Sequence, residues 1–148
     1  MTALLGWMFE KGSTPILERT MDFTEARHRL ILSNVANADT PHYRRLDLDK
    51  KGFTRVLDDA IRSRREYHPG RFEMQHDLRV PTDDRGSYLP GRWFKTGAHE
   101  GPLRHDNNNV SLEREMAILA QNAGAYRRAA GLLRKQLSQI RAAIAERA

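Results

Sequence analysis

An apolar repeat of seven residues near the C-terminal end constrains the fold of this chain more than any other feature. Two rows of apolar side chains share this period, and their members alternate at steps of four and three residues. This spacing is the a/d seam of a coiled-coil-type helix. Ser111 is a suitable N-cap, and a helix from Ser111 to Ala145 would be roughly 50 Å long at about 1.5 Å per residue. The first row contains Leu112, Leu119, Tyr126, Leu133 and Ile140, and the second contains Met116, Ala123, Ala130, Leu137 and Ile144.

A second long helix is expected near the N-terminal end. Ser13-Thr14-Pro15 is a typical helix start, because proline is favoured at the first helical position. Pro41 disfavours helical geometry at the residue before it, so this helix should end between Asn37 and Asp39. The apolar seam predicted on it consists of Leu17, Met21, Ile31 and Val35.

Glycine and proline divide the chain into three segments, 1–39, 40–109 and 110–148, which we expect to form one structural unit. Five of the six prolines and six of the ten glycines lie in the central segment. That segment contains a short helical pattern between Phe53 and Ile61, and an alternating pattern at Phe72, Met74, Leu78 and Val80 that is typical of a half-buried strand. The predicted fold class is mainly α. Two long terminal helices pack as a coiled-coil-like pair, and a loop-rich middle holds a short helix and a little β structure.

Neither terminal helix can bury its seam alone. The other terminal helix is the first candidate partner, in either direction, and a neighbouring copy of the chain is the next. Two facing helices still leave much apolar surface near water, so the pattern predicts assembly rather than a free-standing monomer. The predicted assembly seam comprises Leu17, Met21, Ile31, Val35, Met116, Leu119, Ala123, Tyr126, Leu133, Leu137, Ile140 and Ile144.

Residues that could carry chemistry form no catalytic pattern. The chain has no cysteine, which excludes a thiolate metal site and a cysteine nucleophile, and its six histidines form no i, i+4 pair. Carboxylate pairs such as Asp58-Asp59 are adjacent and point apart, so joint acid–base catalysis is not expected. We therefore expect no enzyme activity, no catalytic residue, no cofactor, no metal and no small-molecule substrate.

The chain is basic, with 25 Lys and Arg residues against 19 Asp and Glu, which gives a net charge of +6. Arginine doublets such as Arg44-Arg45 would suit phosphate contacts, and an alternative interpretation is a basic coiled-coil protein that binds nucleic acid. The cations are scattered and interleaved with acids, so nucleic acid is the less favoured partner. No apolar run reaches the about 18 residues of a membrane span, and no Sec-type signal peptide is recognisable.

The end of the first predicted helix carries a distinctive segment. From Ser33 to Arg44 it reads S-N-V-A-N-A-D-T-P-H-Y-R. It resembles the S-N-[IV]-A-N-x-x-T-P-G-Y signature of bacterial flagellar axial proteins, the rod and hook family. Asparagines three residues apart can bond across a helix interface, and the tyrosine can pack back on the helix. The family's glycine is His42 here, and a position with positive φ would strain histidine. The predicted assembly motif is Asn34, Asn37, Asp39, Thr40, Pro41 and Tyr43.

The start of the last helix is similar to that of the proximal rod members of this family. The matching residues run from Asn109 to Met116 and include Asn122 and Tyr126, and the middle of about 70 residues is too short for the large β-domains of hook and distal rod proteins. The resemblance implies a structural subunit of the flagellar basal-body rod. It also implies export by the flagellar type III apparatus without a cleaved signal peptide, and helical self-assembly. The implied partners are other rod proteins and the membrane-ring and export-gate proteins at the rod base.

Overall fold

The heptad-patterned C-terminal segment forms a single long helix. The computed structural model describes residues 13–66, 72, 74, 96–97 and 105–145, and within them helix α4 runs from Leu112 to Ala145. The predicted start is confirmed, because the helix begins directly after Ser111, whose hydroxyl accepts a hydrogen bond from the Arg114 N–H at 3.4 Å. Glu113 and Glu115 place negative charge in the first turn, where it complements the helix dipole.

The N-terminal helix begins where it was predicted and ends one residue before the predicted range of Asn37 to Asp39. Helix α2 covers Thr14–Ala36, with Pro15 in its first turn. The Asn37 N–H closes its last turn on the carbonyls of Ser33 and Asn34 at 3.1 and 3.2 Å.

The described part of the central segment contains one helix and two short strands. Helix α3 covers Lys50–Glu66, and the Asp49 carboxylate caps it by accepting the Gly52 N–H at 2.9 Å. Strand β1 (Leu46–Asp47) pairs antiparallel with β2 (Thr96–Gly97), with Leu46 opposite Gly97. The strand predicted around Phe72 is absent at the two positions described there, Phe72 and Met74, and its remaining positions, Leu78 and Val80, lie outside the described residues.

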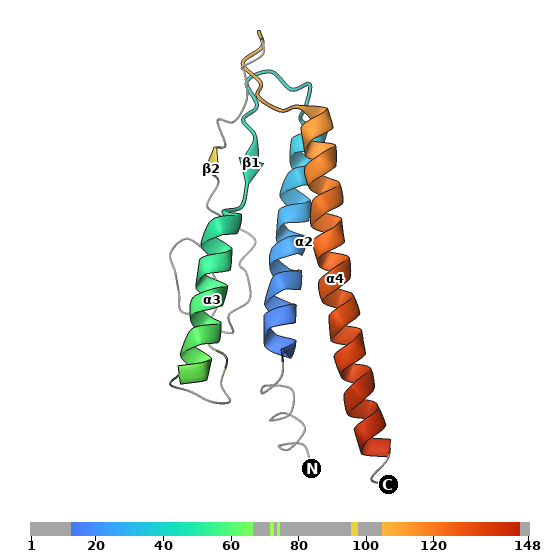
Figure 1. Cartoon of the computed structure of the whole chain (residues 1–148). Coiled ribbons are helices and arrows are strands. Elements are labelled where there is room, and N and C mark those ends of the chain that lie inside the picture. Colours follow the sequence, from blue (N-terminus) through green and yellow to red (C-terminus); the bar gives the residue numbers. More distant parts are fainter. Residues whose placement is uncertain (1–12, 67–71, 73, 75–95, 98–104, 146–148) are drawn as a thin grey trace.

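The described helices are arranged with α2 between α3 and α4 (Figure 1). Helices α2 and α4 run antiparallel along their common length, and α4 continues past the first residue of α2 (Figure 1). The fold is thus mainly helical. None of the described helices has a stretch that is both long and apolar enough to cross a membrane.

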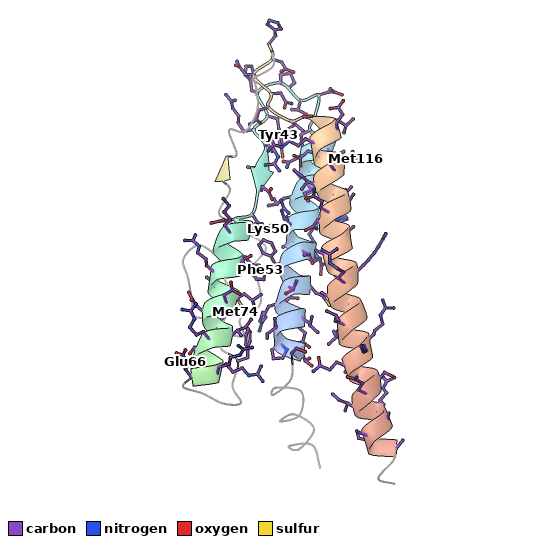
Figure 2. All side chains as sticks on the ribbon, viewed as in Figure 1. Tyr43, Lys50, Phe53, Glu66, Met74 and Met116 are labelled. Carbon is purple, nitrogen blue, oxygen red and sulfur yellow. The ribbon has the colours of Figure 1, made fainter. Side chains whose placement is uncertain are left out.

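A cluster of buried apolar side chains joins α3 to α2. Phe53 points from α3 towards α2, where its ring stacks on that of Phe23 with centroids 4.1 Å apart and an interplanar angle of 6° (Figure 2). Leu48 completes this cluster, and Met74 packs against it. The cluster attaches one side of α2 to the central segment, so the position of α4 must depend on other contacts.

Candidate assembly surface

Polar side chains, rather than the apolar rows, occupy the most deeply buried positions of α4. The buried residues of this helix are Glu115, Asn122 and Ala129, which are spaced by seven, and Gln136 continues the series. We call these four residues the inner row. The inner row lies one residue before each member of the second apolar row, so the helix is rotated away from the orientation that would bury both apolar rows against α2.

The contacts of the inner row explain this rotation. Glu115 accepts a hydrogen bond from the Asn34 amide at 3.0 Å, and the Asn122 amide donates to the Thr24 carbonyl at 2.7 Å. At the far end, the Ser13 hydroxyl donates to the Gln136 side-chain oxygen at 3.0 Å. A buried polar group without a partner costs about 1–3 kcal/mol, so the helix orientation that satisfies the buried Glu115 and Asn122 prevails over a purely apolar contact.

Asn34 is the centre of the contact between the two helix ends. Its side chain is fully buried, and its amide donates to the Leu46 carbonyl at 2.7 Å as well as to Glu115. Its oxygen accepts the Leu46 N–H at 2.9 Å and the Tyr43 hydroxyl at 3.2 Å. One side chain therefore joins α2, β1 and α4.

A buried charge network continues from this point. Arg45 donates through Nε to Glu115 and through its terminal nitrogen to Asp47 at 3.0 Å, and Asp47 also pairs with Arg27 at 2.7 Å. Burial alone would lower the pKa of Arg45, but hydrogen bonds and charge attraction from Glu115 and Asp47 outweigh it and raise that pKa. Burial alone would raise the pKa of Asp47, but Arg27 and Arg45 outweigh it and lower that pKa. Both shifts favour the charged forms of Arg45 and Asp47.

The other members of the predicted motif lie in the turns after α2. Asn37 does not reach α4. Its amide donates to the Ser33 carbonyl at 2.8 Å, and its oxygen accepts the Thr40 hydroxyl at 3.1 Å. Pro41 and Asp39 are exposed. Thus only Asn34 and Tyr43 of the six motif residues belong to the buried contact.

The loop before α4 is fastened to these turns by Asn108. This fully buried side chain donates to the carbonyls of Asn37, Ala38 and Thr40 at 2.8–3.0 Å, and it accepts the Val110 N–H at 2.7 Å. His42 beside it has a φ of 60°, the left-handed conformation for which the flagellar signature has glycine, and its N–H bonds to the Asp106 carbonyl at 2.9 Å.

The predicted seam residues lie largely beside the helix contact. On α2, Ile31 is fully buried, whereas Leu17, Met21 and Val35 are half-buried. On α4, the two apolar rows contain both kinds of residue. The half-buried ones are Leu119, Ala123, Ala130, Leu133, Leu137 and Ile140, and the exposed ones are Leu112, Met116, Tyr126 and Ile144.

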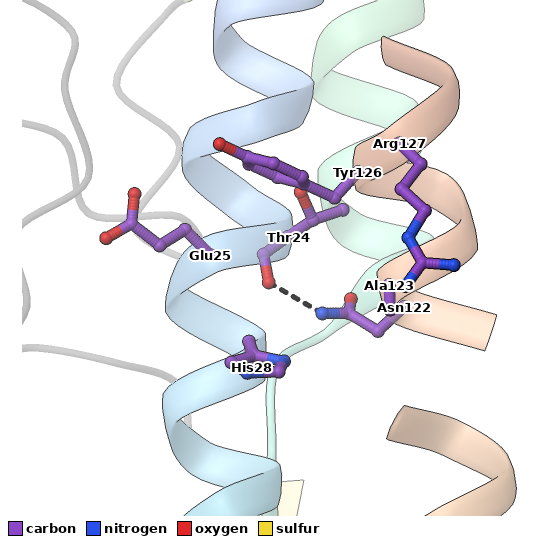
Figure 3. A pocket seen from close by; sticks show the side chains of 7 residues that line it. All are labelled: Thr24, Glu25, His28, Asn122, Ala123, Tyr126 and Arg127. Carbon is purple, nitrogen blue, oxygen red and sulfur yellow. Dashed lines mark hydrogen bonds between the residues drawn. The ribbon is translucent and has the colours of Figure 1, made fainter. Parts of the chain in front are cut away.

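Tyr126 lies on the side of the α2–α4 pair away from α3 (Figure 3), and Leu112 and Met116 share its face of α4 by their helical spacing. A pocket of about 220 Å³ marks this side, and its lining comes from α2 and α4 alone (Figure 3). Leu32 of α2, which is 46% exposed, lies one turn beyond His28 of this pocket, and Met116 of α4, which is 51% exposed, lies one heptad before Ala123 of it. We call the surface formed by Leu32, Leu112, Met116 and Tyr126 the free face.

The free face has the chemistry of a contact surface. Side chains that line its pocket are Thr24, Glu25, His28, Asn122, Ala123, Tyr126 and Arg127. Within the described residues, no three His, Cys, Asp or Glu side chains are grouped closely enough to hold a metal ion. Large apolar groups beside a few polar ones are typical of a surface that packs against another protein.

Sequence reasoning missed the residues that hold α4 in place. Glu115 and Asn122 belong to the C-terminal resemblance, and Asn108 lies in the polar stretch before the helix, but none was assigned a contact. The sequence signal for this contact was the recurrence of polar residues at multiples of seven positions, at Glu115, Asn122 and Gln136, beside the apolar rows. Arg45 and Asp47 carry no comparable signal, because a loop residue in sequence gives no indication of burial.

Two proteins of known family resemble the chain over most of its length. A flagellar basal body rod protein FlgB of Aquifex aeolicus is 31% identical over 111 residues, which is 75% of each chain. The FlgB of Borrelia hermsii is 28% identical over 114 residues, which cover 77% of this chain and 82% of the relative. No family model matches the chain. On this similarity, the chain belongs to the FlgB family of flagellar basal body rod proteins.

Proposed function

We propose that this chain assembles with copies of itself and with other rod proteins through the free face of the α2–α4 pair. The observation that carries the proposal is the exposure of large apolar seam residues after α2 has packed on α4. Leu112, Met116 and Tyr126 repeat along α4 at the spacing of a coiled-coil seam, and they remain between 39% and 51% exposed. A neighbouring helix laid along this face would bury them and complete coiled-coil-like contacts.

The predicted motif contributes to assembly indirectly in this proposal. Asn34 bonds to Glu115 at the start of α4, Tyr43 bonds to Asn34, and Thr40 bonds to Asn37 in the turn that follows α2. A displaced α4 would break the free face, since the face takes residues from both helices. In this proposal the three segments act as one structural unit.

The setting we propose is the base of the flagellar rod. The chain reaches it through the flagellar type III apparatus without a cleaved signal peptide, and it lies beside the membrane-ring and export-gate proteins. The support is the resemblance of both terminal segments to proximal rod proteins and the FlgB name of both relatives. The alternative of a basic nucleic-acid-binding protein is not favoured, because both relatives are named as rod proteins.

A pair of matched substitutions on α4 tests the proposal. Met116→Asp places a charge in the free face, whereas Leu132→Asp places one at a comparably exposed position, 56% against 51%, outside both apolar rows. Each exposed change should alter folding stability by about 0.5 kcal/mol or less, so folded monomer remains in both variants. In a strain that lacks the gene, Met116→Asp should fail to restore motility and should be missing from purified basal bodies, whereas Leu132→Asp restores both. Normal incorporation of Met116→Asp would overturn the proposal.

A further inference from the structure

A second groove lies on the opposite side of the α2–α4 pair, where α3 is attached. It has a volume of about 480 Å³, and its residues come from all three described helices. Phe23 of α2 and Phe53 of α3 form buried apolar parts of its lining. Helix α3 makes few contacts with α4. The two helices therefore form separate walls of the groove, with α2 between them. A groove bordered by three helices is the site at which a fourth helix completes a bundle.

The charges in this groove are of one sign. Arg27, Lys50 and Arg128 are among its lining residues, and no lining residue is acidic. Arg27 is already neutralised by Asp47. In the described part of the chain, neither Lys50 nor Arg128 takes part in an ion pair, and the two residues stand on opposite walls, one on α3 and one on α4. The groove therefore has two positive rims around a lining in which apolar side chains alternate with uncharged polar ones.

Gly124 lies beside Arg128 on the α4 rim. A Cβ atom at this position would lie 3.3 Å from the terminal nitrogen of Arg128. The absence of a side chain lets the Arg128 guanidinium lie close against the helix, at the edge of the groove.

We propose that this groove binds an amphipathic helix of a different protein, one that carries acidic residues along both edges of its apolar face. Charge complementarity selects this occupant, because acidic edges would meet Lys50 and Arg128. A second copy is a poorer fit, since the chain itself is basic, with a net charge of +6. The inference does not rest on self-assembly through the free face, which lies on the other side of the helix pair.

A synthetic helical peptide tests this inference with the full chain. The probe is a fluorescein-labelled peptide of about 18 residues, with leucine and alanine on one face and glutamate along both edges of that face. A second peptide carries lysine in place of glutamate. Fluorescence anisotropy should show saturable binding of the glutamate peptide, weaker at about 0.3 M than at about 0.05 M salt, and no comparable binding of the lysine peptide.

Two double variants then separate the groove from general charge attraction. Lys50→Glu with Arg128→Glu changes both rims, and Arg62→Glu with Arg141→Glu makes the same change in net charge at exposed positions that do not line the groove. The first should weaken binding about tenfold or more, and the second about twofold or less. Equal losses in the two variants would overturn the proposal.

Cross-linking identifies the occupant directly. A benzophenone amino acid in place of Thr54, on the α3 wall, should form a covalent adduct with the glutamate peptide. If that position instead cross-links only to a second copy, or only to residues 75–95 of the same chain, the acidic helix is not the occupant and the inference fails.

Discussion

Replacing Glu115 by alanine should destabilise the whole helix pair, although the residue does not belong to the apolar core cluster. Its carboxylate is fully buried and accepts hydrogen bonds from Arg45 and Asn34. After the substitution the Arg45 guanidinium, itself only 4% exposed, would keep Asp47 as its anionic partner, and Asp47 is shared with Arg27. A buried cation would thus be only partly compensated.

The size of this effect follows from the burial of both partners. Removing one member of a buried ion pair typically costs about 3–5 kcal/mol. Since Asp47 still contacts Arg45, we expect the free energy of unfolding to fall by about 3 kcal/mol. This is a large fraction of the about 5–15 kcal/mol that stabilise an ordinary domain. Replacing both partners by apolar residues, as in Arg45→Met with Glu115→Leu, removes the uncompensated charge and should cost much less than Glu115→Ala alone.

Urea denaturation followed by far-UV circular dichroism measures these differences. Wild type, Glu115→Ala, Arg45→Met and the double variant form the comparison, at a protein concentration low enough to keep the chain monomeric. We expect the double variant to be more stable than Glu115→Ala. A loss below about 1 kcal/mol for Glu115→Ala, or a double variant no more stable than it, would refute the assignment of α4 docking to this buried pair.

Three further predictions concern the same region. Because the pKa of Asp47 is lowered in the folded chain, the unfolded chain takes up this proton at a higher pH, and the free energy of unfolding should fall as the pH drops from about 5 towards about 2. Asp47→Asn should flatten this dependence in urea titrations at a series of pH values. An unchanged slope in the variant would contradict the prediction. Asn108→Ala leaves several buried backbone groups without their partner and should lower the free energy of unfolding by about 2 kcal/mol or more in the same assay; a smaller loss would mean that water replaces the amide. His42→Gly relieves a left-handed backbone conformation and should raise the melting temperature, with a stability gain of about 0.5–1 kcal/mol; a lower melting temperature would show that the imidazole makes a compensating contact.

Local sequence signals were sufficient to predict the helices. Ser111 and Pro15 mark the starts of α4 and α2, and Pro41 marks the end of α2, because capping and proline geometry act over a few residues. The helical pattern around Phe53 likewise became α3, although that helix extends beyond the predicted core of the pattern. These features depend on neighbours in sequence, so one chain is enough to reveal them.

The orientation of α4 could not be predicted in the same way. The apolar rows alone favour a symmetrical seam towards α2, whereas the observed orientation depends on Glu115 meeting Arg45 and Asn34, which are 70 and 81 residues away in the sequence. Periodicity does not reveal a contact between residues so far apart. Periodicity also does not show which of two asparagines on one helix face makes such a contact. Asn37 shares this face with Asn34, but its amide bonds to Ser33 at the end of its own helix.

The inner row also determines how the two helices respond to a force along their axes. Sliding one helix past the other by a single turn, about 5.4 Å, would separate Glu115, Asn122 and Gln136 from their partners at the same time. A purely apolar contact would offer nearly equivalent packing after such a step, but these polar contacts do not. The pair therefore resists axial shear through a few side chains, spread over the length that both helices share.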